Sequence, residues 1–297
     1  MKSQREGFRD PAFPPAMEAA LGGKTVALYT LLAKLSGLPG TRINQGMVEA
    51  FAVEAAASGK RADALVRAML LLDADFAPGG SAHEVVPVCA VHALGLRGRD
   101  PSARAEAVDL LHAASDDFRF RVRDAVPIAI ARIGEAAGDA LVMEIEPFMD
   151  GYFHASAALA ALGIASFLDA TKDGKEVTAR LHQGFLLVKD AKRSASRYPG
   201  HKALMETLLT VPALLARRYP NEIVAEVDTW ATVKDPDLRA LALGVARSLH
   251  ARHGEDAERI AASLERTKPV ARDPTLMVQG TRGRGKKKGL RGRGPAT

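Results

Sequence analysis

The cationic side chains of residues 280–297 have the most recognisable chemistry in this sequence. Lys and Arg recur there at intervals of one to three positions, with no Asp or Glu among them. Each can neutralise a phosphate and release its counterion, and the glycines between them favour neither helix nor strand. We therefore expect residues 268–297 to form a disordered basic tail that binds nucleic acid or another polyanion. Its cations are Arg282, Arg284, Lys286, Lys287, Lys288, Arg291 and Arg293.

The rest of the chain is close to neutral. The sequence holds 41 Lys and Arg against 35 Asp and Glu, so removing the 7 tail cations leaves 34 against 35, a formal charge of −1. The Arg-Gly spacing resembles RGG-type RNA-binding tails, but without the aromatic residues that stack on bases. That resemblance implies weak electrostatic binding with no sequence preference. An anionic membrane surface, an acidic protein partner, improved solubility and nuclear import are the alternative roles for the tail.

A second group of cations surrounds Ser194-Ala195-Ser196. Its position within the helical part of the chain suggests a secondary basic patch that binds anions, and a pair of solvated helix ends is the alternative interpretation. Arg217 and Arg218 form a smaller group with the same two interpretations. The members of the larger group are Lys189, Lys192, Arg193, Arg197 and Lys202, with His201 beside them.

Potential metal ligands do not form a complete motif. Cys89 and His92 lie three residues apart, as do His250 and His253. A closed zinc site needs four converging ligands, and no second pair has matching spacing. The apolar residues around Cys89 indicate a small core side chain instead. We therefore expect no metal.

The segment Gly22-Gly23-Lys24-Thr25 matches the end of a phosphate-binding P-loop. Glu18 stands where the first glycine of that motif belongs, and no buried strand precedes the segment. An interruption between two helices is the better interpretation. No nucleophile, His and acid occur at a recognisable spacing, so we expect no catalytic residues and no cofactor.

Apolar residues recur at helical spacing in almost every window. Between 235 and 249 they form one stripe, with Asp235 as a cap and Pro236 in the first turn. A stripe over 122–133 is expected to end at Gly134. Because no segment alternates β-branched residues convincingly, we expect an all-α chain of about a dozen helices. The other stripes lie near 16–36, 42–58, 60–73, 82–95, 101–114, 137–149, 152–169, 175–192, 200–218, 220–232 and 255–266.

The helical pattern also repeats. Residues 122–134 and 238–249 align at an offset of 116, close to three periods of 39, and 103–114 aligns 19 residues before the first. The segment 116–134, DDFRFRVRDAVPIAIARIG, resembles the HEAT-repeat signature, and 235–249 resembles it without the closing glycine. The resemblance implies a HEAT-like α-α superhelix over residues 15–267, a solenoid that binds macromolecules. Residues 1–14 are then a flexible N-terminus. An irregular helical bundle with coincidental repeats is the alternative.

Three arginines occupy matching positions in these repeats, namely Arg104, Arg123 and Arg239. Each follows an Asp in the preceding turn. We expect Arg–Asp pairs that join neighbouring repeats and cap helices. The alternative is an anion-binding ridge, which the near-neutral charge of the body disfavours.

Two enzyme classes share the HEAT-like fold that the resemblance implies. Alkylated-base DNA glycosylases combine tryptophans with a catalytic acid; here Trp230 is the only tryptophan, with Asp228 or Asp235 as the acid. One ring leaves the cage for a cationic base incomplete, so Trp230 is expected to pack between repeats. Deoxyhypusine hydroxylase needs several His-Glu dyads, and only His83-Glu84 fits that pattern, so we exclude this activity.

We expect a non-catalytic adaptor whose helical ridge binds a protein partner and whose tail attaches to RNA or DNA. An alkylated-base DNA glycosylase is the alternative, and a purely structural helical protein is the third interpretation. The single cysteine suits a reducing compartment. The first residues lack the apolar run of a signal peptide, and the most apolar stretch, 155–168, is too short to span a bilayer. We therefore expect a cytoplasmic protein with no transmembrane segment.

Overall fold

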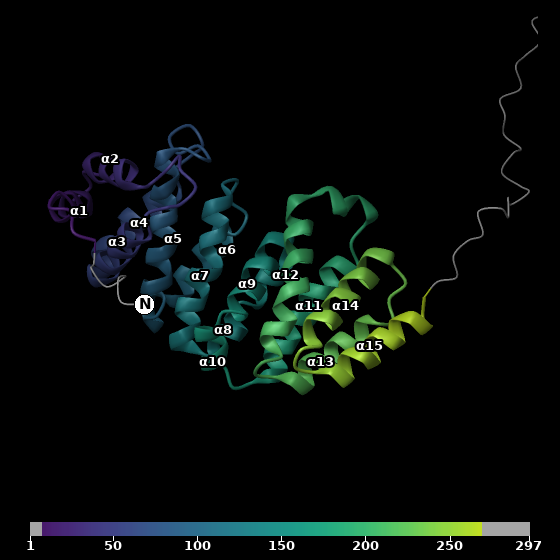
Figure 1. Cartoon of the computed structure of the whole chain (residues 1–297). Coiled ribbons are helices and arrows are strands. Elements are labelled where there is room, and N and C mark those ends of the chain that lie inside the picture. The colour runs from purple at the N-terminus through teal and green to yellow at the C-terminus, as the bar shows by residue number, and fades with distance from the viewer. Residues whose placement is uncertain (1–7, 269–297) are drawn as a thin grey trace, which may run out of the picture.

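The computed structural model describes residues 8–268, which form an all-α structure with no strand in that range. Figure 1 shows the helices crossing the molecule from α1 and α2 at one end to α15 at the other. The α-helices are α1 (Phe13–Leu21), α2 (Val26–Leu35), α3 (Gln45–Ala57), α4 (Asp63–Leu70), α5 (Val85–Arg97), α6 (Pro101–Ala114), α7 (Phe120–Ala137), α8 (Asp139–Glu144), α9 (Tyr152–Leu162), α10 (Ala165–Ala170), α11 (Gly174–Lys189), α12 (Pro199–Leu215), α13 (Pro220–Trp230), α14 (Pro236–Leu249) and α15 (Gly254–Arg266). Short 3₁₀ segments are η1 (Gly59–Ala62), η2 (Ala82–Glu84), η3 (Glu146–Asp150) and η4 (Arg193–Arg197).

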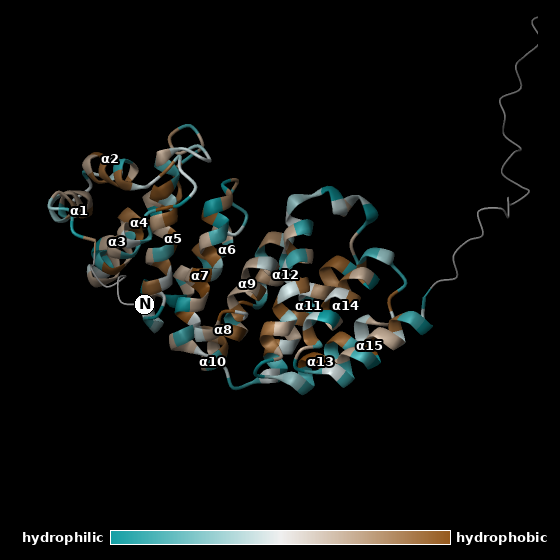
Figure 2. Ribbon diagram, viewed as in Figure 1, coloured by the Kyte–Doolittle hydropathy of each residue, from teal (hydrophilic) through white to brown (hydrophobic). Residues whose placement is uncertain are grey.

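Ten of the helices form two series, and within each series every helix packs against the next. The first series is α3, α5, α7, α9, α12 and α14. The second is α8, α11, α13 and α15, and α11, α13 and α15 also pack on helices of the first series. Hydrophobic faces lie between the helices, and hydrophilic residues follow the outer connections (Figure 2).

Helix α14 shows how the sequence specifies these elements. Asp235 Oδ1 accepts hydrogen bonds from the backbone N–H groups of Asp237 at 2.9 Å and Leu238 at 3.1 Å, which satisfies two donors of the first turn. Pro236 occupies the position where no hydrogen-bonded N–H is needed. The predicted stripe is confirmed as the buried face: Leu238, Leu241, Ala242, Val245, Ala246 and Leu249.

Two helix boundaries were predicted at glycines, and the structure confirms one of them. The interruption expected at 22–25 is confirmed, and Gly23 has a φ of +90° that other residues rarely adopt. The predicted end of a helix at Gly134 is wrong, because α7 continues to Ala137 and ends at Gly138, where φ is +55°. Gly134 instead lets the ring of Phe167 approach the α7 backbone, where a Cβ would overlap that ring.

Other boundaries also differ from the expected ones. Helix α1 begins at Phe13, so two residues of the expected flexible N-terminus are helical. The stripe at 137–149 is divided into α8 and η3 at Ile145. The stripe at 152–169 is divided into α9 and α10 around Gly163.

Polar contacts recur between side chains that lie about forty residues apart. The sequence separations of these pairs run from 37 to 44. Each joins two helical segments that other helices separate in the chain. The pairs are Arg67–Glu106, Glu84–Arg121, His112–Asp150 and His182–Glu226.

Within residues 8–268, no helix combines the length and apolar character needed to cross a bilayer.

Candidate functional site

The α11–α12 basic surface consists of the five cations predicted as a secondary patch. They follow the end of α11, η4 and the start of α12, and Figure 2 shows this connection as largely hydrophilic. All five are exposed, and none forms an ion pair with another of residues 8–268. Their charge is therefore available to an anion. The five are Lys189, Lys192, Arg193, Arg197 and Lys202.

Local hydrogen bonds hold this connection in place. The Ala195 N–H donates to the Lys192 carbonyl at 2.8 Å, and the Tyr198 N–H donates to the Ala195 carbonyl at 2.9 Å. Gly200 then lies against α9, where a Cβ would be 3.1 Å from the ring of Phe153. The basic surface is thus attached to a packed element.

An aromatic cavity of about 380 Å³ opens beside the basic surface. Tyr198 is 62% exposed and immediately follows Arg197, a cation of the basic surface. The Tyr152 ring lies 5.3 Å from that of His201, and the guanidinium of Arg123 lies 4.4 Å from the centre of the Phe153 ring. Tyr152 and Phe153 are half-buried, so Tyr198 is the exposed ring of this group. An exposed aromatic ring beside cations is the combination on which unpaired bases stack. The cavity is lined by Asp116, Gly151, Tyr152, Phe153, His154, Tyr198, Pro199 and Gly200.

A cluster of His112, Asp150 and His154 lies next to this cavity. Nε2 of His112 is 3.1 and 3.2 Å from the two carboxylate oxygens of Asp150, and Nδ1 of His154 is 2.7 Å from Oδ1. Partial burial alone would raise the pKa of Asp150, but the hydrogen bonds from His154 and His112 outweigh it and lower that pKa. The carboxylate therefore stays ionised between two imidazoles. The sequence motifs predict no metal site, and they do not indicate this cluster, because His112 is 38 residues from Asp150 in the chain.

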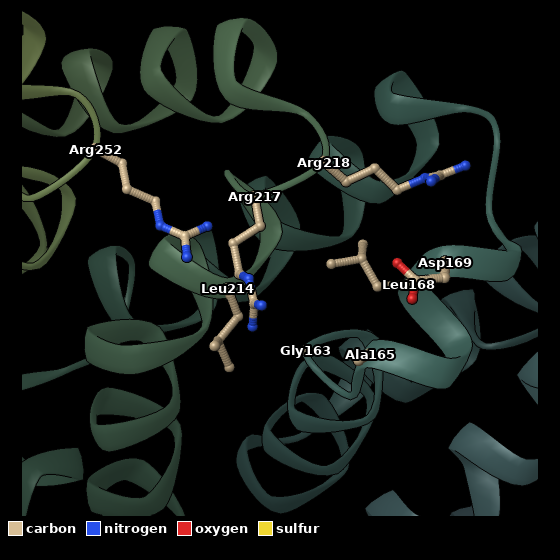
Figure 3. Close-up of a pocket in the computed structure, with 8 residues that line it drawn as sticks. All are labelled: Gly163, Ala165, Leu168, Asp169, Leu214, Arg217, Arg218 and Arg252. Carbon is tan, nitrogen blue, oxygen red and sulfur yellow. The ribbon is translucent and has the colours of Figure 1, made fainter.

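A cationic cavity of about 450 Å³ lies between α10, α12 and the turn after α14. Figure 3 shows Arg217 and Arg252 extending toward one open space, with Asp169 on its other side. Arg218 is engaged, since it donates to the Thr171 carbonyl at 2.9 and 2.7 Å. Arg217 and Arg252 form no ion pair within residues 8–268. The sequence indicated Arg217 and Arg218 but missed Arg252, which only the fold brings to them.

The three repeat arginines are used within the fold. In each case a guanidinium N–H donates to the backbone carbonyl six residues earlier: Arg104 to Gly98, Arg123 to Asp117 and Arg239 to Val233. The expected helix caps are confirmed at Asp100 and Asp235, but the expected Arg–Asp side-chain pairs are wrong. The guanidinium groups bond to orphan carbonyls of the turn before the helix instead, and Arg104 also pairs with Glu144 at 3.6 Å. Their shared geometry shows that the repeated residues have a repeated local structure. The guanidinium groups are therefore occupied, which disfavours an anion-binding ridge.

The residues of the glycosylase alternative do not converge. Trp230 is fully buried, stacks on Phe185 at 4.3 Å and donates to Glu226 at 2.8 Å, which confirms its predicted packing role. Asp228 is bonded to Arg259 at 2.6 Å. Asp235 is the cap of α14 described above, so neither acid lies free beside an accessible ring.

The two pairs of potential metal ligands, Cys89 with His92 and His250 with His253, have other surroundings than a metal site requires. Cys89 is fully buried, as predicted, and burial raises the pKa of its thiol. His92 is buried beside it in α5. His250 lies 3.6 Å from Glu258.

The tail cations Arg282, Arg284, Lys286, Lys287, Lys288, Arg291 and Arg293 lie outside the described residues. No protein-family model matches the chain, and no curated protein or solved structure matches it.

Proposed function

We propose that this protein is a HEAT-like helical-repeat scaffold that binds single-stranded nucleic acid. The repeat assignment is supported by polar contacts about forty residues apart and by the arginine–carbonyl bond found at three matching positions. Successive packing of α5, α7, α9, α12 and α14 agrees with a stack in which each unit touches its neighbours. This architecture offers long surfaces for binding and requires no catalytic centre.

The observation that carries the proposal is the α11–α12 basic surface with an exposed tyrosine beside it. Unpaired cations attract phosphates, and Tyr198 together with the aromatic cavity offers a stacking surface for bases. The basic tail adds further cations, and tethering raises the local concentration of each site near the same strand. Arg217 and Arg252 provide a second cationic position on the folded body.

A protein partner on the ridge remains part of the proposal. Two cavities of about 440 and 450 Å³ lie on the surface of α5, α7, α9 and α12. Phe120, which is 50% exposed, and Ile128, which is 41% exposed, line the first of them. Exposed apolar side chains in a recess suit a protein surface of matching shape. Affinity purification followed by loss of the partner in a Phe120→Ser, Ile128→Ser variant tests this part.

Fluorescence anisotropy with a labelled single-stranded oligonucleotide tests the nucleic-acid part. If all five cations of the basic surface contact phosphates, affinity from this surface falls about a hundredfold between 50 and 200 mM salt. Replacing the five with serine should lower both the affinity and the salt dependence. Tyr198→Ala should weaken binding by about 1–3 kcal/mol while leaving the salt dependence unchanged.

A matched control removes the same charge elsewhere. Serine replacements at five exposed lysines that form no ion pair within residues 8–268 should change binding much less. A third protein carries serine in place of the seven tail cations. If the basic-surface variant binds like its control, the surface is not the site. If the tail variant also binds like wild type, neither of the proposed cation sets holds the strand. Nucleic-acid binding itself is refuted if wild type does not bind the oligonucleotide at about 50 mM salt. The control positions are Lys24, Lys34, Lys60, Lys172 and Lys175.

A further inference from the structure

Two of the eight histidines meet one carboxylate on the surface of the fold. His112 comes from the last turns of α6, Asp150 from the end of η3, and His154 from the first turn of α9. One ligand atom from each residue lies within 4.8 Å of the other two. The side chains of His112 and His154 are 28% and 18% exposed, so the cluster is partly screened yet open to solvent.

We propose that His112, Asp150 and His154 bind a divalent first-row transition metal, with Zn²⁺ as the ion best suited to the site. Two imidazole nitrogens and a carboxylate oxygen form a donor set that such ions prefer over Mg²⁺ or Ca²⁺. This binding does not depend on the nucleic-acid binding proposed above, although His154 also lines the aromatic cavity.

The spacing of each imidazole nitrogen from the carboxylate is close to what a metal requires, and the two nitrogens lie within 4.8 Å of each other. With zinc–ligand bonds of about 2.0–2.1 Å, neighbouring ligands of a tetrahedral site are about 3.3 Å apart. The nitrogen–oxygen separations here are 2.7 Å for His154 and 3.1 Å for His112. Small side-chain movements therefore exchange the shared hydrogen bonds for metal bonds. Each imidazole then binds the ion through the nitrogen that now faces the carboxylate and, as a neutral ring, carries its proton on the other ring nitrogen.

Packing restricts both imidazoles before any ion arrives. The edge of Phe148 meets the His112 ring, with centroids 4.9 Å apart and planes at 88°. The two imidazole centroids are 4.0 Å apart. Gly151 lies directly against His154, where a Cβ would be 2.8 Å from Nδ1, so only glycine leaves room for this ligand atom. Preorganised ligands lose little conformational freedom when a metal binds.

Three protein ligands leave one coordination position of a tetrahedral ion open. His154 and Gly151 also line the aromatic cavity, so space for a water molecule or a small anionic ligand lies beside the cluster. The one carboxylate reduces the net charge of the ion and its ligands from +2 to +1. The resulting site would keep an affinity for anionic oxygen atoms.

Calorimetric titration of the metal-free, full-length protein with ZnCl₂ tests the proposal, and CoCl₂ with visible absorption provides a second probe. We expect one equivalent to bind. His112→Ala and Asp150→Asn should each weaken that binding by at least about a hundredfold, since even the loss of an outer-shell partner weakens metal sites 10–100-fold. The control is His182→Ala, which removes a histidine that faces the carboxylate of Glu226 at 2.9 Å without a second imidazole.

Asp150→Asn preserves the shape of the side chain and guards against a variant that fails to fold. Imidazole ¹⁵N spectra give an independent measurement, in which Zn²⁺ should shift Nε2 of His112 and Nδ1 of His154. The proposal is overturned if no equivalent binds, if these variants bind zinc like wild type, or if the ion shifts other histidines. Because no nucleic acid is present, such a failure would leave the proposed function untouched.

Discussion

His92 should make the protein less stable in mild acid. Its side chain lies in α5, only 4% of the residue is exposed, and Nδ1 has no hydrogen-bond partner among residues 8–268. Burial, and then the positive charge of Arg132, lower the pKa of His92 from 6.5 to about 4. The folded protein therefore holds this imidazole neutral over a range in which the unfolded chain protonates it.

The sign and size of the effect follow from that difference in pKa. Above about pH 6.5 both states carry a neutral His92, and its contribution to stability is complete. As the pH falls from 6.5 toward 4, the unfolded state gains a proton that the folded state does not. The full difference corresponds to about 3 kcal/mol, of which about 2 kcal/mol is already lost at about pH 5.

Urea unfolding of wild type and His92→Leu at about pH 7.5 and about pH 5 measures this loss. Trp230 is the only tryptophan and is fully buried, so its fluorescence reports unfolding. Between the two pH values, wild type should lose about 2 kcal/mol more than His92→Leu. An exposed-histidine control, His250→Leu, should follow wild type. Parallel losses in wild type and His92→Leu would refute the reasoning.

Two substitutions and one thiol-labelling experiment test the packing. Gly134→Ala should lower the free energy of unfolding by about 1–3 kcal/mol, because the new methyl group overlaps the Phe167 ring; Phe167→Leu should recover part of this loss, and an unchanged urea midpoint would contradict the contact. Trp230→Ala should lower it by about 3–5 kcal/mol, through the cavity left against Phe185, as followed by circular dichroism; a loss below about 1 kcal/mol would argue against a buried ring. Cys89 should resist a thiol reagent such as DTNB in the native protein and react fully in urea, because burial raises the pKa of its thiol; rapid native modification would contradict its placement.

Local features of the sequence were sufficient to predict individual helices. The cap at Asp235, the proline after it and the apolar stripe of α14 all lie within fifteen residues of one another. The interruption after Gly22 was also predictable, because a glycine pair breaks a helix wherever it occurs. The all-α class follows from many such local decisions.

Boundaries that depend on distant residues could not be predicted in this way. Gly134 was expected to end its helix, since glycine commonly does so. Its actual reason is the ring of Phe167, which α10 brings from 33 residues further along the chain. The three arginines fail for a different reason: the carbonyl groups that they bond are only six residues earlier, but which group each guanidinium reaches depends on the shape of the turn between them.

In the proposed repeat arrangement, the cluster of His112, Asp150 and His154 illustrates how a repeat period can locate distant partners. His112 and Asp150 are 38 residues apart, within the range that also separates Arg67 from Glu106 and Glu84 from Arg121. If each unit of about forty residues packs on the next, residues one period apart are neighbours regardless of the helices between them. A ligand pair in such a chain is therefore expected at the repeat spacing as well as at the three- or four-residue spacing of one helix. The four-residue spacing within one segment joins Asp150 to His154, but only the longer spacing brings His112 to them.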